Sequence, residues 1–242
     1  VPAERLKAMD QDEVDTHTFF PDIAGFGNAG FQKEGSEEFR LAAIRAYNDW
    51  LVEEWTDFSP RYISQCISPM WSAELARAEI ERSVKKGHKG IIWHGAPEVL
   101  DLPYLNDTHW DPVYEVAADM GAPLALHLGA IPTLPAFPGY SPQTSRAMGG
   151  TRSVSSQIQV VANILFSGIF DRFPKLKTIT VESAIGWIPY LLETADHNYE
   201  NFKLWEEGVT TKPSEAFHNN MWANFWFERN GILNRFVIGI DN

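Results

Sequence analysis

The sequence contains very little cysteine. Cys66 is the single cysteine among 242 residues, which excludes an internal disulfide and a metal cluster held by several cysteines. It lies in the apolar run RYISQCISPM, so we expect a buried, unreactive thiol in preference to a nucleophile. No apolar run approaches the roughly 20 residues of a membrane span, and no basic, apolar leader opens the sequence. We therefore expect a cytoplasmic protein without a membrane partner.

Basic residues are also scarce. The chain has 20 lysines and arginines against 32 acidic residues, a formal net charge of −12. Such a field repels nucleic acid and anionic membranes, so neither is expected as a partner. It does not exclude a small anionic substrate, because a local basic pocket can override the global charge. The hydrophobic share of 44% is ordinary for a globular protein, and we expect residues 1–242 to form a single domain.

What the sequence does contain is a regular alternation of apolar runs and amphipathic runs. Helices are expected between the strands, with a long loop rich in Pro, Gly and Ser over 131–153. The expected strands begin near Val14, Arg61, Gly90, Leu124, Thr178 and Met221, and the last runs to Glu228. Strict alternation with short connections predicts parallel strands in sequential order in one curved sheet.

Two architectures have this alternation, a closed barrel and a doubly wound open sheet. The segment FFPDIAGFGNAGF lacks the glycine spacing of a phosphate loop and the helix that should follow directly. Polar residues instead follow several strands, as they do at the mouth of a (β/α) barrel. These residues are His94, His127, Glu182, Ser183 and Glu228. The barrel is therefore favoured over the open sheet.

Several segments, in order, resemble one family. They are ERLKAMDQDEVD, YNDWLVEEWTDFSPRYISQCISPM, HWDPVYEVAADMGAPLALHLG, GIFDRFPKLKTITVESAIGWIPYLLETADH and PSEAFHNNMWANFWFE. The chain resembles the amidohydrolase-related family (amidohydrolase 2), in the branch of 2-amino-3-carboxymuconate-6-semialdehyde decarboxylase and the non-oxidative aromatic acid decarboxylases. The resemblance implies an α/β fold, the (β/α)8 TIM barrel, of which the six strands are strands 2 to 7. Strands 1 and 8 have no counterpart, so the domain is expected to be incomplete at both ends.

The resemblance also implies one divalent metal at the barrel mouth, zinc in first place and manganese in second. His127 matches the family's ligand on strand 5; without the resemblance, a lone strand histidine reads more readily as a core residue. The ligand pair of strand 1 is absent, and Asp241 would lie upstream of the aspartate ligand of strand 8. The metal site is therefore expected to be incomplete.

The turn VESAIGW after the fifth expected strand departs from the family as well. Related decarboxylases often carry a histidine there, whereas this chain has Glu182 and Ser183. Glu182 is a candidate proton carrier, provided that burial makes its carboxyl less acidic. Its alternative role is a hydrogen bond to a neighbour in the barrel. Ser183 is a candidate for substrate binding.

Further candidates surround the expected mouth. His94 is a candidate proton donor or substrate ligand, and its alternative is a simple loop histidine. Trp110 is a candidate substrate contact, although HWDP serves equally well to start a helix. Arg146 and Arg152 fall in the long loop, where an arginine suits a carboxylated substrate, and their alternative is solvation.

Three functions follow from this reading. The first is a metal-dependent decarboxylase of a carboxylated aromatic or ring-cleavage compound. The second is a metal-dependent hydrolase of an ester, amide or lactone, and the third a metal-free binding relative. A homodimer is also expected, because relatives usually form dimers and because the chain has 9 Trp and 15 Phe, residue types common at interfaces.

Overall fold

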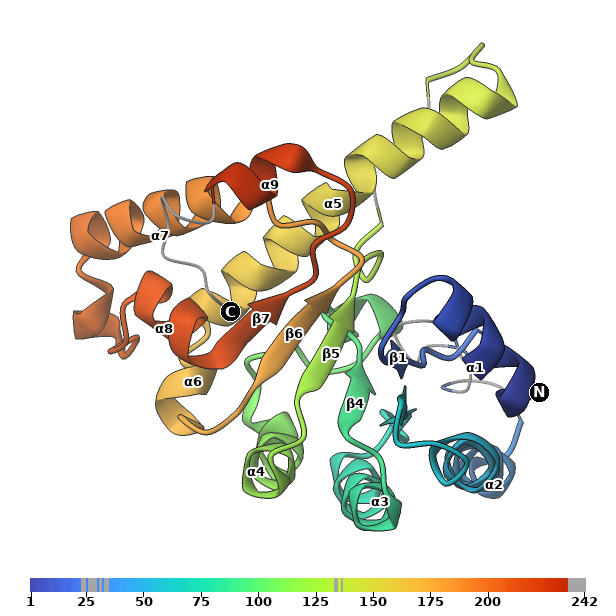
Figure 1. Cartoon of the computed structure of the whole chain (residues 1–242). Coiled ribbons are helices and arrows are strands. Elements are labelled where there is room, and N and C mark those ends of the chain that lie inside the picture. The colour runs from blue at the N-terminus through green and yellow to red at the C-terminus, as the bar shows by residue number, and fades with distance from the viewer. Residues whose placement is uncertain are drawn as a thin grey trace.

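Short parallel strands form the centre of the fold in the computed structural model (Figure 1). The structure describes residues 1–22, 25, 30, 32, 35–132, 135 and 137–234. The strands are β1 (His17–Thr18), β2 (Tyr62–Ile63), β3 (Gln65–Cys66), β4 (Gly90–Trp93), β5 (Leu124–His127), β6 (Thr178–Val181) and β7 (Met221–Ala223).

The sequential, parallel strand order confirms the prediction from sequence, but the single sheet does not: among the described residues, β1 and β2 form a two-stranded sheet and β3 to β7 a five-stranded one. Strands β3 to β7 pair in sequential order, and every pair is parallel. β1 pairs with β2 in the same parallel sense, and Ser64 alone separates β2 from β3. The run that begins at Arg61 therefore pairs with β1 through its first half and with β4 through its second. The strand predicted to reach Glu228 ends at Ala223.

Helices connect the strands. The elements are α1 (Pro2–Gln11), α2 (Glu37–Leu51), α3 (Ala73–Lys86), α4 (Asp111–Met120), α5 (Pro142–Phe166), α6 (Ile169–Arg172), α7 (Ile188–Phe202), α8 (Pro213–Asn220) and α9 (Arg229–Asn234). A π-helical turn (Val52–Thr56) extends α2, and three 3-10 turns cover Pro97–Leu100, Thr108–Trp110 and Leu204–Glu207. No helix in the described part of the chain is long and apolar enough to cross a membrane.

Local sequence signals set several helix ends. The Ser72 side chain accepts a hydrogen bond from the backbone N–H of Leu75, and Gly87 closes the same helix, α3. Pro112 stands in the first turn of α4, which ends at Gly121 in the left-handed region. Both helices lie where the sequence placed them.

The prediction of a long loop over 131–153 is wrong from Pro142 onward, where α5 begins. Ser141 caps α5 by accepting from the backbone N–H of Thr144, and Pro142 follows at the first helical position. The pair Gly149–Gly150 disguised the helix, because glycine is a poor helix former. The first half of α5 projects away from the body of the molecule (Figure 1).

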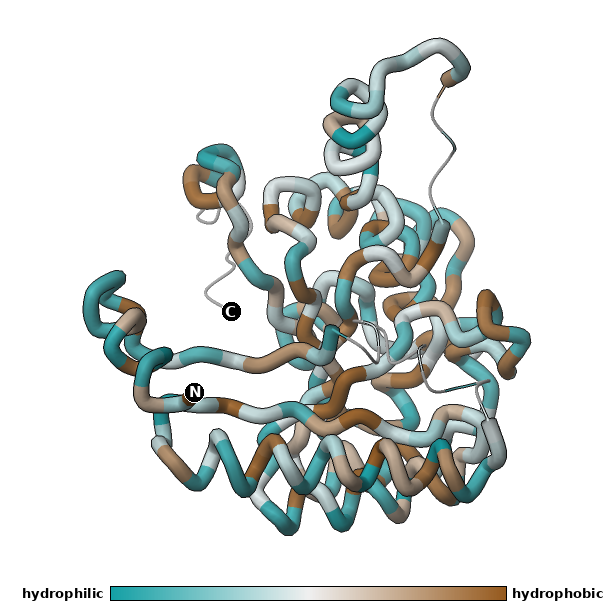
Figure 2. The backbone as a smooth tube through the Cα atoms, turned by 90° about the vertical axis from the view of Figure 1, so that its right-hand side faces the viewer, coloured by the Kyte–Doolittle hydropathy of each residue, from teal (hydrophilic) through white to brown (hydrophobic). Residues whose placement is uncertain are grey.

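Apolar side chains pack on both faces of the strands. Figure 2 shows hydrophobic residues concentrated along the central strands, while the helices alternate in hydropathy. The larger core, here called the outer core, lies under the helices and takes the strand residues Ile91, Trp93, Leu124, Leu126 and Met221. The smaller inner cluster consists of Ile44, Ile67, Ile92, Ala125 and Val181. Alternation along each strand separates the two sets.

The arrangement is the predicted α/β one, with consecutive parallel strands of a barrel and helices outside. Cys66 is fully buried, and burial raises the pKa of its thiol to about 12. The thiolate is therefore inaccessible at neutral pH, as the sequence predicted.

Candidate active site

His127 occupies the carboxyl end of β5 on the inner side of the sheet. Its neighbour Leu126 enters the outer core, whereas Ala125 enters the inner cluster, so alternation turns His127 inward. It pairs in register with Val181 of β6. Only 5% of the residue is exposed. This is the position expected of a residue at a barrel mouth.

The hydrogen bonds of His127 define its chemistry. Nδ1 lies 3.0 Å from the carbonyl oxygen of Leu128, and because a carbonyl only accepts, we assign the ring hydrogen to Nδ1. Nε2 then faces the carboxylate of Glu182 at 3.4 Å. An unprotonated nitrogen and a carboxylate both carry lone pairs, so their approach calls for a positive charge between them. A second ring proton or a metal ion supplies it.

Glu182 reaches this position through an unusual turn after β6. Both Glu182 and Ala184 have positive φ, 53° and 59°, a left-handed conformation that costs on the order of 1–2 kcal/mol for a residue with a Cβ. Such strain concentrates at functional sites. The Glu182 side chain is 57% exposed, so the burial on which its predicted role as an acid depended is absent.

His94 follows β4 directly and is buried. Trp93 pairs in register with Leu126, so the next residues of the two strands, His94 and His127, come side by side. Its Nδ1 accepts from the backbone N–H of Ala96 at 3.2 Å. Burial lowers the pKa of His94, which leaves a neutral ring with its hydrogen on Nε2 at pH 7.

The loop that carries His94 lies very close to α5. A Cβ at Gly95 would come within 2.7 Å of a Val160 methyl, closer than atoms tolerate, so only glycine fits here. The helix thereby fixes the loop that holds His94 at the mouth.

Phe20 is a site residue that the sequence reasoning missed. Its ring lies 5.7 Å from the ring of His127, inclined at 65°, an edge-to-face contact. The available signal was its position just after the first expected strand, at the end where a barrel builds its mouth.

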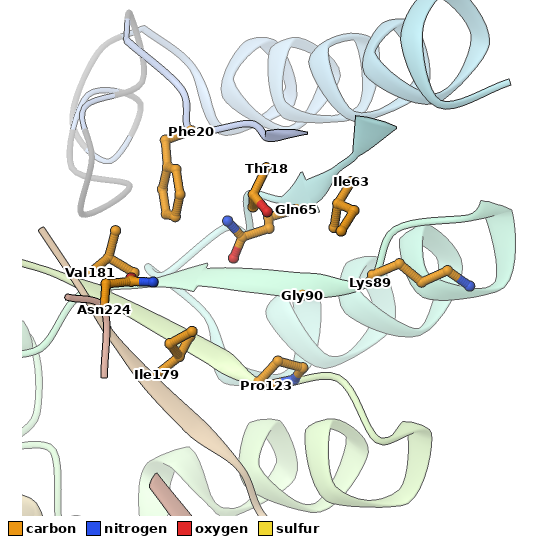
Figure 3. A pocket seen from close by; sticks show the side chains of 10 residues that line it. All are labelled: Thr18, Phe20, Ile63, Gln65, Lys89, Gly90, Pro123, Ile179, Val181 and Asn224. Atoms are coloured by element: carbon orange, nitrogen blue, oxygen red, sulfur yellow. The ribbon is translucent and has the colours of Figure 1, made fainter. Parts of the chain in front are cut away.

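A cavity of about 180 Å³ lies next to Phe20. Phe20 and Gln65 face Ile179 and Val181 across it (Figure 3). The remaining lining residues are Thr18, Ile63, Lys89, Gly90, Pro123 and Asn224. The space is mainly apolar, and a cavity of roughly 150 Å³ accommodates benzene. It therefore has the volume of one aromatic ring.

Three other candidates do not join this cluster as expected. Trp110 is fully buried in the outer core, packs edge-to-face on Trp93 and donates its indole N–H to the carbonyl of Pro103. Its position beneath the helices corrects the prediction of a mouth residue. Arg146 and Arg152 stand on helix α5 and not on a substrate loop. The first is exposed, and Arg152 lies 3.5 Å from the carbonyl of Pro135.

Ser183 follows Glu182 but is completely buried. Within the described part of the chain its hydroxyl has no hydrogen-bond partner, while its carbonyl accepts from the indole N–H of Trp187. A role in substrate binding stays a prediction for this residue. Glu228, predicted at a strand end, instead accepts from the backbone N–H groups of Ile185 and Phe227.

Two residues at the mouth carry donor atoms of the kind that bind divalent metals. The imidazole nitrogen of His127 and the carboxylate of Glu182 are donor types that suit zinc or manganese. Within the described ranges, no three His, Cys, Asp or Glu residues gather closely enough to hold a metal. Asp241, which was expected upstream of the strand-8 ligand, lies outside those ranges. The pair therefore fits a divalent metal in donor chemistry but supplies two ligands.

Known proteins share this fold. An amidohydrolase from Mycobacterium avium subsp. paratuberculosis K-10 superposes with a TM-score of 0.74 at 25% identity, over 99% of this chain and 62% of that one. A dihydroxybenzoic acid decarboxylase from Polaromonas sp. JS666, solved with manganese and 2-nitroresorcinol, gives 0.73 at 21% identity, over 98% and 71%. The fold is thus that of the amidohydrolase TIM barrels.

Sequence comparison gives the family. The γ-resorcylate decarboxylase of Polaromonas sp. strain JS666 is 26% identical over 199 residues, which cover 80% of this chain and 58% of that protein. The chain thus spans somewhat more than half the length of this relative. The amidohydrolase family model matches residues 1–230. The chain belongs to the amidohydrolase family.

Proposed function

We propose that the protein is a metal-dependent decarboxylase that removes CO2 from a carboxylated aromatic compound. The observation that carries the proposal is the contact between His127 Nε2 and the Glu182 carboxylate, 3.4 Å apart at the barrel mouth. A cavity lined by Phe20, which contacts the His127 ring, and by Val181, its partner in register, has the volume of one ring. Similar proteins are described as decarboxylases of γ-resorcylate and dihydroxybenzoic acid, which supports this reaction over hydrolysis.

His127 and Glu182 would hold the metal, together with ligands from outside the described residues. When bound, a divalent metal supplies a Lewis acid that polarises a substrate oxygen. The sequence favoured zinc over manganese, whereas the similar decarboxylase holds manganese. We therefore propose a divalent metal and give manganese the same standing as zinc.

The remaining chemistry is a proton transfer. Loss of CO2 leaves an electron pair on the ring carbon, which must take up one proton. Water at the mouth supplies this proton, because the Glu182 carboxylate is assigned to the metal and its side chain is 57% exposed. His94 is neutral and offers its Nε2–H as a hydrogen-bond donor, which suits a substrate oxygen.

Metal depletion and reconstitution test the proposal in the full-length protein. Chelation should abolish CO2 release from γ-resorcylate, and manganese or zinc should restore it. Glu182→Gln removes a charged ligand and should lower both the manganese content and the turnover of the reconstituted protein. Full activity after chelation would refute the proposal. Release of an alcohol or amine from esters or amides, without decarboxylation, would establish the hydrolase in its place.

The homodimer remains part of the proposal. Large apolar side chains are exposed on the surface, among them Tyr190 at 75%, Phe202 at 70% and Phe227 at 73%. Aromatic residues are enriched at interfaces between subunits. Light scattering of the full-length protein at micromolar concentration should give twice the monomer mass, and a monomer would contradict the prediction.

A further inference from the structure

Arg40 and Trp71 lie at the same end of the sheet as His127. Arg40 belongs to the first turns of α2, the helix after β1, and Trp71 stands between β3 and the Ser72 cap of α3. In a β/α unit, the carboxyl end of the strand and the start of the following helix share one face of the barrel. Trp71 and Phe20 both pack against the inner cluster, and Phe20 contacts His127. The pair therefore belongs to the mouth.

The two side chains are stacked. The guanidinium carbon of Arg40 lies 4.2 Å from the centre of the Trp71 ring, a cation–π contact. One terminal nitrogen of Arg40 donates to the backbone carbonyl of Gln32. Stacking and this bond hold the guanidinium in one plane, which pre-organises its remaining N–H groups for a planar acceptor.

Two donors in this stacked pair have no acceptor among the described residues. Nε of Arg40 and Nε1 of Trp71 are both buried, and neither has a hydrogen-bond partner in that part of the chain. A buried donor without an acceptor is costly, since it has lost its water and gained nothing. Two such donors in one contact indicate an acceptor that arrives with a ligand.

We propose that Arg40 and Trp71 form the carboxylate-binding element of the substrate site, an inference that rests on the proposed function for the identity of the ligand. A carboxylate accepts hydrogen bonds at two oxygens and carries the negative charge that a guanidinium prefers. The chain as a whole carries a net charge of −12. A negatively charged substrate therefore needs a local cation of this kind. Arg40 and Trp71 would select acids over uncharged analogues of the same ring.

The experiment compares two ligands that differ by one group. Calorimetry measures the binding of γ-resorcylate and of resorcinol, the same ring without the carboxylate, to manganese-loaded full-length protein. Arg40→Gln should weaken the binding of γ-resorcylate by about tenfold or more, which is the range for loss of a hydrogen bond to a charged group. Resorcinol should bind as it does to the unmodified protein.

Two further variants separate the donors from the charge. Trp71→Phe keeps a ring under the guanidinium but removes the N–H, and it should weaken γ-resorcylate by about three- to tenfold. Arg40→Lys keeps the charge but loses the planar donors, and it should also weaken the binding of γ-resorcylate. Lys85→Gln, at the far end of α3 with 65% of its side chain exposed, is the control for net charge and should change neither affinity.

The outcomes distinguish the two proposals. Unchanged affinity for γ-resorcylate in both Arg40→Gln and Trp71→Phe would overturn the inference, as would an equal loss for both ligands, which indicates a structural role. Binding that depends on Arg40, in a protein that releases no CO2, would uphold the carboxylate site and refute the decarboxylase. If Arg40→Gln fails to fold, as judged by circular dichroism, Trp71→Phe and Arg40→Lys decide the matter.

Discussion

The hydrogen bonding of two polar clusters among the described residues differs sharply. The first, here called the helix cluster, joins α2 to α3 through Asn48, Glu79, Arg82 and Ser83. One carboxylate oxygen of Glu79 accepts from the other three, at 2.8, 2.8 and 3.0 Å. Asn48 also bonds both the N–H and the carbonyl of Ile67. These groups bond to one another and to the backbone.

The second cluster is the mouth, with His94, His127 and Glu182. Here Glu182 is exposed for more than half of its side chain. Nε2 of His127 faces that carboxylate. His94 accepts from Ala96 at Nδ1, so its hydrogen is on the other ring nitrogen, Nε2. The comparison indicates a division of roles. Polar groups that satisfy one another stabilise the fold, and polar groups at the mouth are placed where a ligand would meet them.

The largest expected effect concerns Glu79, whose side chain is completely buried. Glu79→Ala removes the acceptor shared by three donors, including the Arg82 cation, and should lower the free energy of unfolding by about 3–5 kcal/mol. Urea unfolding measures the change. Glu81→Gln, on the same helix but paired only at the surface with Lys85, should leave the midpoint unchanged. Equal midpoints for Glu79→Ala and the parent would contradict the stabilising role of the helix cluster.

Acid should weaken both clusters in two stages. Burial lowers the pKa of His94 and of His88, whose Nε2 lies 3.0 Å from the carbonyl oxygen of Asn48 beside the helix cluster, below the usual histidine value near 6.5. The unfolded chain therefore binds more protons, and stability is full above pH 6.5 and falls below it, by at most about 1.4 kcal/mol per pH unit for each histidine. Burial alone would raise the pKa of Glu79, but bonds from Arg82, Asn48 and Ser83 hold it below 4.5. Its contribution is lost last, as pH falls through that lowered value.

Urea midpoints measured across this range test the order of events. The midpoint should begin to fall below about pH 6.5, and His94→Asn should reduce the first fall while leaving the second. A midpoint that stays constant down to the carboxylate range would show that the two histidines do not titrate differently in the folded chain.

A smaller effect is expected at Trp110, which the structure assigns to the outer core. Trp110→Phe leaves the Pro103 carbonyl without its donor and shortens a packed ring, at a cost of about 1–2 kcal/mol in unfolding free energy. The KM for substrate should not change. A raised KM with unchanged stability would return Trp110 to the mouth.

The smallest effect is expected at Arg146, on the exposed part of α5. Arg146→Gln should alter neither the urea midpoint nor the affinity for γ-resorcylate, in contrast to Arg40→Gln. A loss of affinity at Arg146 comparable to that at Arg40 would place the carboxylate contact on α5.

The sequence predicted the fold better than it predicted the mouth. Alternating runs and clear caps, such as Ser72 and Gly87, identified the strand order because local signals specify each element. His127 and Glu182 were also predicted as neighbours, since the ends of sequential parallel strands meet. The prediction for Trp110 was wrong because the sequence around a helix start is the same whether the Trp side chain faces the barrel mouth or the outer core. The stacking of Arg40 on Trp71 joins residues far apart in the chain, and no local pattern reports it.

The most direct test of the division of roles measures bound metal and stability in the same two variants. His127→Ala and Asn48→Ala are compared in the full-length protein, by elemental analysis of manganese and zinc and by urea unfolding. His127→Ala should lose the metal. Its urea midpoint should change only slightly, by no more than a typical substitution at the surface. Asn48→Ala, which breaks the bonds to Ile67 and Glu79, should unfold at markedly lower urea and, while folded, keep the metal. Retention of metal by His127→Ala, together with a large loss of stability, would make His127 a core residue and contradict the account.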